Sequence, residues 1–160
     1  MLFSVSTCFH LSCYADEKNI FRRALHIADR ITIYFYISAS FTPWICLRTF
    51  DRLDSESILF TLWIAAFIGI VLQYIIHEKY KLIETLLYVI VTLIPSVCFI
   101  FMENLDGVWT NALAGFVYLI GLIFFKSDGK ILFAHTIWHI FVAIGASIQY
   151  YAITTHLLQN

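Results

Sequence analysis

Long apolar runs separated by short polar connectors dominate this chain of 160 residues. A helix needs about 20 mostly apolar residues to cross roughly 30 Å of hydrocarbon at about 1.5 Å per residue. Five runs reach that length, near Ile27 to Leu47, Ile58 to Ile76, Leu82 to Met102, Val108 to Phe125 and Ile131 to Leu157. A sixth run, Met1 to Tyr14, reaches only about 21 Å as a helix and is too short to span unaided. The pattern predicts an all-α, polytopic transmembrane helical bundle that forms one integral-membrane domain over residues 1–160.

Composition agrees with a membrane protein and excludes several other classes. Hydrophobic residues make up 61% of the chain and charged residues 13%, and the mean hydropathy is +0.82. A soluble domain carries about 45–50% apolar and about 25% charged residues. The chain has no phosphate loop, no kinase or Ser/His/Asp series and no basic patch, so we expect no nucleic-acid partner. Its four cysteines form no CxxC pair, which argues against a redox motif or a sulfur-rich metal site.

Basic residues gather in alternate connectors. They lie in 15–26, 77–81 and 126–130, and these connectors are predicted to face the cytosol. The loop 103–107 and the tail after Leu157 carry no basic residue. Arg48 and Arg52 depart from the rule, but they share their loop with three acidic residues. The tail is therefore predicted on the extracellular or lumenal side.

Two histidines interrupt the last apolar run, four residues apart. In a helix, His135 and His139 share one face, about 6 Å apart along the axis. Ionisable side chains within a membrane span are costly, which makes such a pair a functional-site hypothesis. The spacing by itself leaves open a second interpretation, in which the pair is simply two hydrogen-bonded histidines of the protein core.

The predicted topology gives this pair a depth near the cytosolic face. His10 precedes the first basic connector and Asp29 follows it, so both fall at that same depth. Three neutral imidazoles with one open position form the ligand set of a catalytic zinc, and Asp29 would hold the bound water or accept its proton. Asp29 can also be interpreted as part of an interfacial anchor with its neighbour Arg30.

Three further polar residues are considered as members of this set. Ser6 precedes His10 by four residues and shares its helix face, where its hydroxyl would support the ligand or contact a substrate. His77 is embedded in the polar run HEKYK, and His156 lies at the opposite end of the last span, which excludes it from the set.

These motifs resemble those of a known family. SxxxH at Ser6 to His10, an aspartate at Asp29 and HxxxH at His135 to His139 resemble the zinc-site signature of the progestin and adipoQ receptor family, which includes the hemolysin III-like proteins. The strings FHLSCY, DRITIYFYISASFTPW, HEKYK, FFKSDG and FAHTIWHIFVA resemble one branch of it along essentially the whole chain.

The resemblance implies a seven-helix fold with zinc near the cytosolic face. It implies His10, His135 and His139 as metal ligands, Asp29 as the acid beside the zinc-bound water, and Ser6 as the serine of the first motif. Relative to the family, this chain starts inside the SxxxH segment. We therefore expect the first family helix and about half of the second to be missing, which leaves His10 on a shortened helix.

Two functions are compatible with these features. The resemblance implies a receptor-like multi-pass protein of the Golgi or other endomembranes, or of the plasma membrane, which modulates signalling with membrane lipids and signalling proteins as partners. The alternative is a zinc-dependent intramembrane hydrolase of a lipid amide or ester, in which Asp29 directs the water. The latter requires a lipid ligand or substrate to reach the metal.

Overall fold

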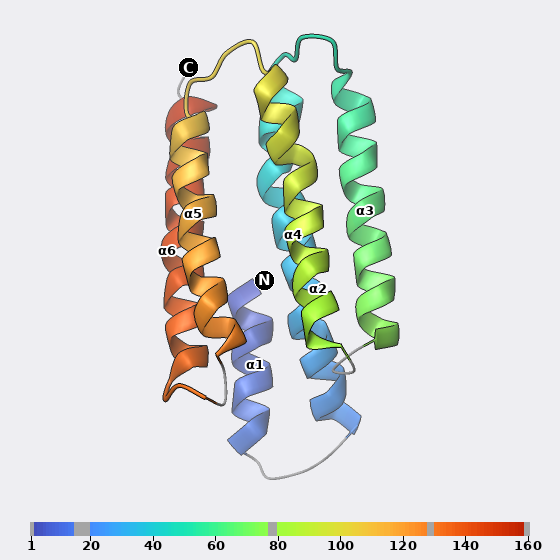
Figure 1. The fold of residues 1–160 in the computed structure, drawn as a ribbon, viewed down its shortest axis with the longest axis vertical. Coiled ribbons are helices and arrows are strands. Elements are labelled where there is room, and N and C mark those ends of the chain that lie inside the picture. The colour runs from blue at the N-terminus through green and yellow to red at the C-terminus, as the bar shows by residue number, and fades with distance from the viewer. Residues whose placement is uncertain (1, 15–19, 77–79, 128–129, 159–160) are drawn as a thin grey trace. The chain divides into compact units, whose positions relative to one another are not determined.

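A computed structural model describes residues 2–14, 20–76, 80–127 and 130–158. The helices, in chain order, are α1 (Leu2–Tyr14), α2 (Ile20–Leu47), α3 (Ser55–Ile76), α4 (Lys81–Cys98), the short 3-10 helix η1 (Phe99–Phe101), α5 (Val108–Lys126) and α6 (Ala134–His156). No β-strand forms within the described ranges, which contain one isolated bridge between Phe50 and Met102. The prediction of an all-α fold is confirmed (Figure 1). Lys18, His77 and Lys79 lie outside the described residues.

Four of the described helices are long and apolar enough to cross a membrane. They are Ser55–Ile76, Leu82–Phe101, Val108–Lys126 and Ala134–His156. These helices fit an integral, multi-pass membrane protein, as predicted. A shorter apolar helix covers Leu2–Ser12. α2 has 28 residues but carries four charged residues in its first eleven, and its predicted span of 27–47 stays a prediction.

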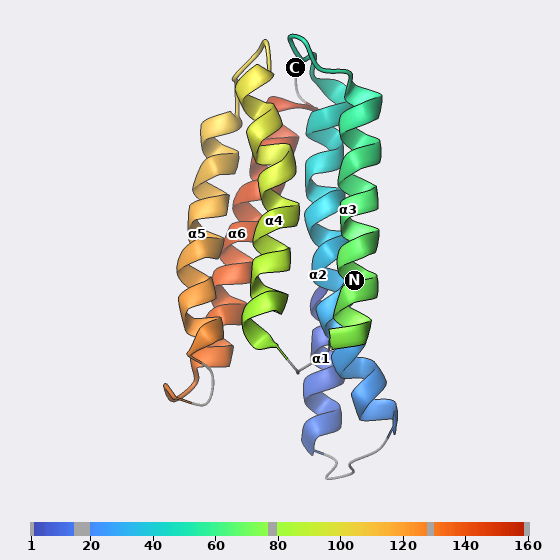
Figure 2. The ribbon, with the colours of Figure 1, turned by 45° about the vertical axis from the view of Figure 1, so that its right-hand side comes forward.

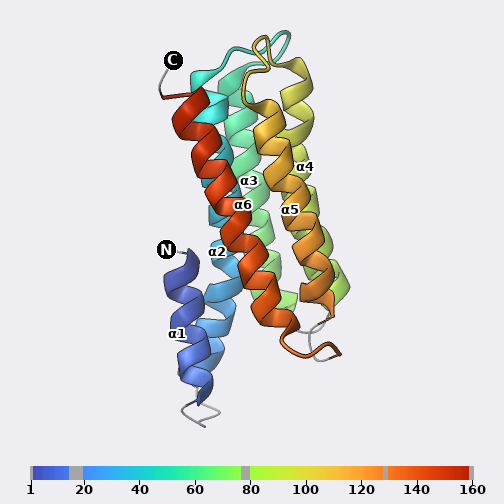
Figure 3. The same cartoon turned by 90° about the vertical axis from the view of Figure 1, so that its left-hand side faces the viewer.

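Contacts divide the chain into two compact units, Met1–Met102 and Glu103–Asn160, which are described separately. In the first unit, α2 contacts α1, α3 and α4. Figure 2 shows α2 and α3 running side by side along most of their length. The shorter α1 lies beside the amino-terminal part of α2 (Figure 3).

Aromatic side chains fill the end of the first unit where α2 and α4 finish. The ring of Phe99 lies 5.5 Å from that of Phe41 and 5.8 Å from that of Trp44, measured between centroids. The amide of Asp51 donates a hydrogen bond of 2.7 Å to the carbonyl of Phe101. Together these contacts hold the loop after α2 against the end of α4.

The second unit is an antiparallel pair of helices, α5 and α6 (Figure 1). Two glycines let these helices approach closely. A Cβ at Gly145 would lie 2.6 Å from Cε1 of Tyr118, and one at Gly121 would lie 2.7 Å from Cβ of Phe141. Both distances are well inside van der Waals contact, so only glycine fits without a shift of its neighbours.

Polar side chains add hydrogen bonds to the same interface. The hydroxyl of Tyr118 donates to Oε1 of Gln149 at 3.1 Å, and Nε2 of Gln149 donates to Oδ1 of Asn111 at 3.3 Å. Gln149 and Asn111 are both buried. Such bonds between membrane helices fix their register, and here they fix α6, which carries the histidine pair.

Candidate metal centre

The two histidines of α6 converge at their ring nitrogens. Nε2 of His135 lies 3.1 Å from Nε2 of His139, and the rings meet at 76° with centroids 4.7 Å apart. In a tetrahedral zinc site with bonds of about 2.0–2.1 Å, two nitrogens lie about 3.3 Å apart. The pair therefore has the spacing of two ligands on one ion. A hydrogen bond between one protonated ring nitrogen and one free one also fits this distance.

Local structure sets where this pair sits on α6. Before the helix, the amide of Ile131 donates to the carbonyl of Ser127, and the amide of Ala134 donates to that of Ile131. Phe133 then adopts the left-handed conformation, with φ at 60°, immediately before the helix begins. The predicted span started at Ile131, and this turn is why the helix starts at Ala134. His135 is consequently in the first turn.

Aromatic residues of the second unit line one side of the pair. The ring of Phe125, near the end of α5, lies 6.4 Å from His135 and 5.2 Å from Trp138, between centroids. Trp138 in turn lies over Gly121, where no side chain competes for the space. These contacts restrict the orientation of His135 and give that side an apolar surface, which favours metal binding by neutral imidazole.

His10 and Ser6 lie on α1 in the first unit. His10 is half-buried, and its ring centroid is 5.0 Å from that of Phe9. Phe9 stacks on His26 of α2, with centroids 4.5 Å apart and planes within 5°. The stack holds α1 against α2 and assigns His26 a packing role. Ser6, one turn before His10, is buried.

Asp29 is also buried, at 8% exposure, on the part of α2 that follows α1 in the chain. The hydroxyl of Thr32 donates a hydrogen bond of 2.8 Å to the backbone carbonyl of Asp29. The next residue, Arg30, is half-buried, and its carbonyl accepts a hydrogen bond of 3.3 Å from the Tyr88 hydroxyl. A carboxylate buried this deeply faces the protein interior, which does not favour its interpretation as a solvated interfacial anchor.

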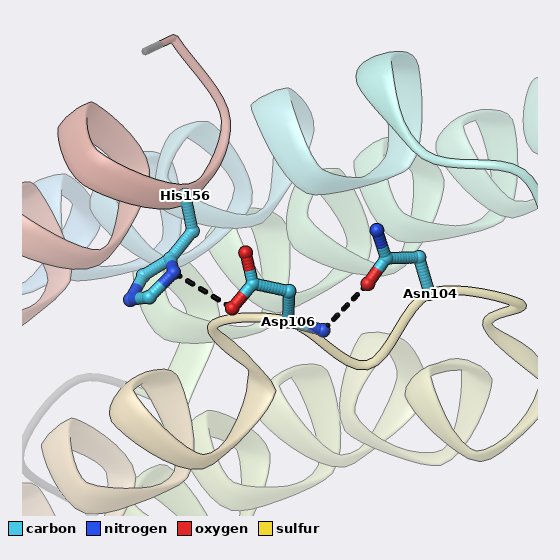
Figure 4. Close-up of polar contacts among 3 residues, drawn as sticks. All are labelled: Asn104, Asp106 and His156. Carbon is cyan, nitrogen blue, oxygen red and sulfur yellow. Dashed lines mark hydrogen bonds and ion pairs between the residues drawn. The ribbon is translucent and has the colours of Figure 1, made fainter. Parts of the chain in front are cut away.

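His156 lies at the opposite end of α6 from the pair, as predicted. Its Nδ1 contacts Oδ1 of Asp106 at 3.0 Å, and Oδ1 of Asn104 accepts a hydrogen bond of 2.8 Å from the Asp106 amide (Figure 4). This contact ties the end of α6 to the loop that precedes α5.

One buried acid was not found from the sequence. Glu84 is 4% exposed in the first turn of α4, beside the buried Thr85. It lies only three residues beyond the basic connector 77–81, where a charged residue is expected at the membrane surface. The signal that identifies it is an acid inside an apolar run, the same rule that identified Asp29.

Comparisons with known proteins agree with the motifs. The model of the family described as "Haemolysin-III related" matches residues 1–150. The chain is 41% identical to the monocyte to macrophage differentiation factor of Homo sapiens over 160 residues, which covers 99% of this chain and 67% of that protein. It is 27% identical to hemolysin-3 of Bacillus cereus over 161 residues, which covers 99% and 71% respectively. No solved structure gives a significant match. The chain therefore belongs to the haemolysin III-related family, the same progestin and adipoQ receptor family that its motifs resemble.

Proposed function

We propose that this chain is a receptor-like multi-pass membrane protein in which His10, His135 and His139 bind one zinc ion near the cytosolic face, and that it modulates signalling at endomembranes. The observation that carries the proposal is the convergence of His135 and His139 on a spacing of 3.1 Å between their Nε2 atoms. The three histidines each offer one ring nitrogen and are each half-buried, and as a set they could hold a metal ion.

The donor chemistry fits zinc. Neutral imidazole is a preferred zinc ligand, and three histidines leave a fourth tetrahedral position open. The aromatic side chains around His135 restrict its ring, which reduces the rearrangement that metal binding requires. Zinc bound there would polarise a ligand or water at the open position.

The signalling role is supported by similarity alone. The chain is 41% identical to a protein named for monocyte to macrophage differentiation, over nearly the whole chain. In that role, zinc would join α1 to α6 and stabilise one arrangement of the helices. The test is to express the wild type and His139→Ala in cells and to locate both proteins by microscopy. The changes in transcription that each protein causes in those cells are then compared. An endomembrane protein with no zinc-dependent response would contradict this role.

The metal site has a direct test. We expect the protein, purified in detergent without chelators, to contain about one zinc per chain by elemental mass spectrometry. His135→Ala and His139→Ala should lose the metal because each removes one of two converging ligands. His156→Ala is the matched control, since it changes a histidine at the far end of the same helix. Zinc near zero in the wild type, or retained in both variants, would refute the site.

Burial of Asp29 is the observation that supports a second candidate, the zinc-dependent lipid hydrolase. If Asp29 positions a water, Asp29→Asn should abolish turnover of a lipid amide or ester while bound zinc and thermal stability stay nearly unchanged. Absence of turnover in the zinc-loaded wild type would instead leave the receptor-like role.

A further inference from the structure

The interior of the first unit contains a group of polar side chains at the depth of the membrane spans. We define the Glu84 cluster as Tyr34 of α2, Gln73 of α3, and Glu84 and Tyr88 of α4. All four are buried, with exposed fractions of 0%, 0%, 4% and 7%. Polar groups buried in this way are costly unless they are hydrogen-bonded, and ionisable groups within membrane helices mark functional sites by default.

Contacts within the cluster connect three helices. The Tyr88 hydroxyl lies 3.3 Å from Oε1 of Gln73, and the Tyr88 ring lies 4.7 Å from that of Tyr34, between centroids. Glu84 precedes Tyr88 by one helical turn and shares its face. Glu84 is therefore a buried carboxylate on the same face of α4 as Tyr88, the residue whose ring packs against Tyr34.

The Tyr34 hydroxyl is the unusual member. Its ring is held between Tyr88 and the backbone of α3 at Gly69, where an added Cβ would lie 2.8 Å from Cδ1 of the ring. The ring therefore has little freedom to turn elsewhere. Its hydroxyl is fully buried and has no hydrogen-bond partner among the described residues. A buried hydroxyl left without a partner carries its full desolvation penalty.

We propose that the Glu84 cluster is a binding site for ordered water inside the first unit. A water there would accept a hydrogen bond from the Tyr34 hydroxyl and donate one to the Glu84 carboxylate. Buried waters typically make about three hydrogen bonds to polar groups that protein atoms leave unsatisfied. Acids within membrane bundles face either such partners or a hydrated cavity. This site is independent of the zinc proposal, since it uses none of the histidines.

Tyr34→Phe tests the proposal because it removes only the hydroxyl and keeps the ring that packs on Gly69 and Tyr88. If the hydroxyl binds water, the variant should melt about 2–6 °C below the wild type in detergent, as a buried hydrogen bond is lost. If the hydroxyl binds no water, its removal should leave the Tm unchanged or raise it. That result would overturn the proposal. Tyr150→Phe is the matched control, because Tyr150 is 72% exposed on α6. It should not change the Tm.

A second measurement reports the water itself. Short X-ray pulses generate hydroxyl radicals from bound water, which oxidise nearby side chains even when these are buried. We expect Tyr34 to be oxidised in the wild-type protein and Phe41, a reactive aromatic residue of the same helix that is 5% exposed, to be protected. Glu84→Gln should reduce the oxidation of Tyr34 at least twofold. Oxidation of Tyr34 no faster than that of Phe41 would overturn the proposal.

Discussion

Gly145→Ala should destabilise the second unit, because the added methyl group has no room. Its Cβ would lie 2.6 Å from Cε1 and 2.7 Å from Cζ of Tyr118. Carbon atoms pack at about 3.5–4.0 Å, so the ring would have to retreat by roughly 1 Å. The ring cannot move freely, since its hydroxyl is bonded to Gln149 at 3.1 Å.

The expected magnitude combines two effects. Overpacking a close contact costs about 1–3 kcal/mol, and an interhelical hydrogen bond in a membrane protein contributes about 0.6 kcal/mol. For a protein of this size the sum corresponds to a decrease in Tm of about 3–14 °C. The assay is thermal unfolding in detergent followed by tryptophan fluorescence, to which Trp138 of α6 contributes.

Gly115→Ala provides the matched control. It makes the same chemical change on α5, where nothing lies within 4 Å of the added Cβ, and it should leave the Tm unchanged or slightly raise it. In a double-mutant cycle, Tyr118→Ala should remove most of the penalty of Gly145→Ala, because it removes the ring that is displaced. Equal Tm values for the two glycine variants would refute close packing of α5 on α6 at Gly145.

Three other predictions concern the loops and the metal. Asp54→Ala should destabilise the start of α3, where Oδ2 of Asp54 accepts hydrogen bonds of 2.9 Å from both the amide and the hydroxyl of Ser57. These bonds lower the pKa of Asp54. The variant should therefore be less stable than the wild type at neutral pH, and the difference should disappear as the pH falls through that lowered pKa. Melting curves recorded over a range of pH would measure this difference. Chelation should lower the Tm of the wild type, by an amount equivalent to about 2.7 kcal/mol if free zinc had been 100-fold above its Kd. It should leave the Tm of His139→Ala unchanged. An equal decrease in Tm for both proteins would contradict a site at His139. A double-mutant cycle of His156→Gln and Asp106→Asn should give a coupling free energy of only about 0.2–1 kcal/mol, because Asp106 is 46% exposed. A cycle with no measurable coupling would show that this pair does not hold the end of α6.

The hydrophobic pattern was sufficient to locate the helices, because each of them carries apolar side chains along most of its length. It was less reliable for their ends. α2 begins at Ile20, seven residues before the predicted span, because an apolar pattern excludes the charged residues Arg22 and Arg23 although a helix can contain them. α6 begins at Ala134 because Phe133 adopts a left-handed conformation that no apolar pattern records.

Site residues could be predicted where spacing along one helix determines geometry. The pair His135 and His139 follows from helical periodicity, and the structure brings its nitrogens to 3.1 Å. Glu84 could be identified from the sequence only as an acid inside an apolar run, because its burial results from helix packing that spacing along one helix does not record. The sequence predicted only the depth of Asp29, and neither its burial nor the packing role of His26 against Phe9 was predicted.

Different contacts hold the two parts of the proposed zinc site. His135 and His139 lie four residues apart on one helix, so helical periodicity sets their spacing without any metal, and glycine contacts and the hydrogen bonds of Gln149 hold that helix against α5. His10 lies on a 13-residue helix held to α2 through the Phe9 and His26 stack. A chelating pair that is already organised loses little entropy on binding, while the third ligand must be brought in by its own helix. Zinc affinity in this protein should therefore depend on the packing of α5 on α6 for its first two ligands, and on the docking of α1 for its third.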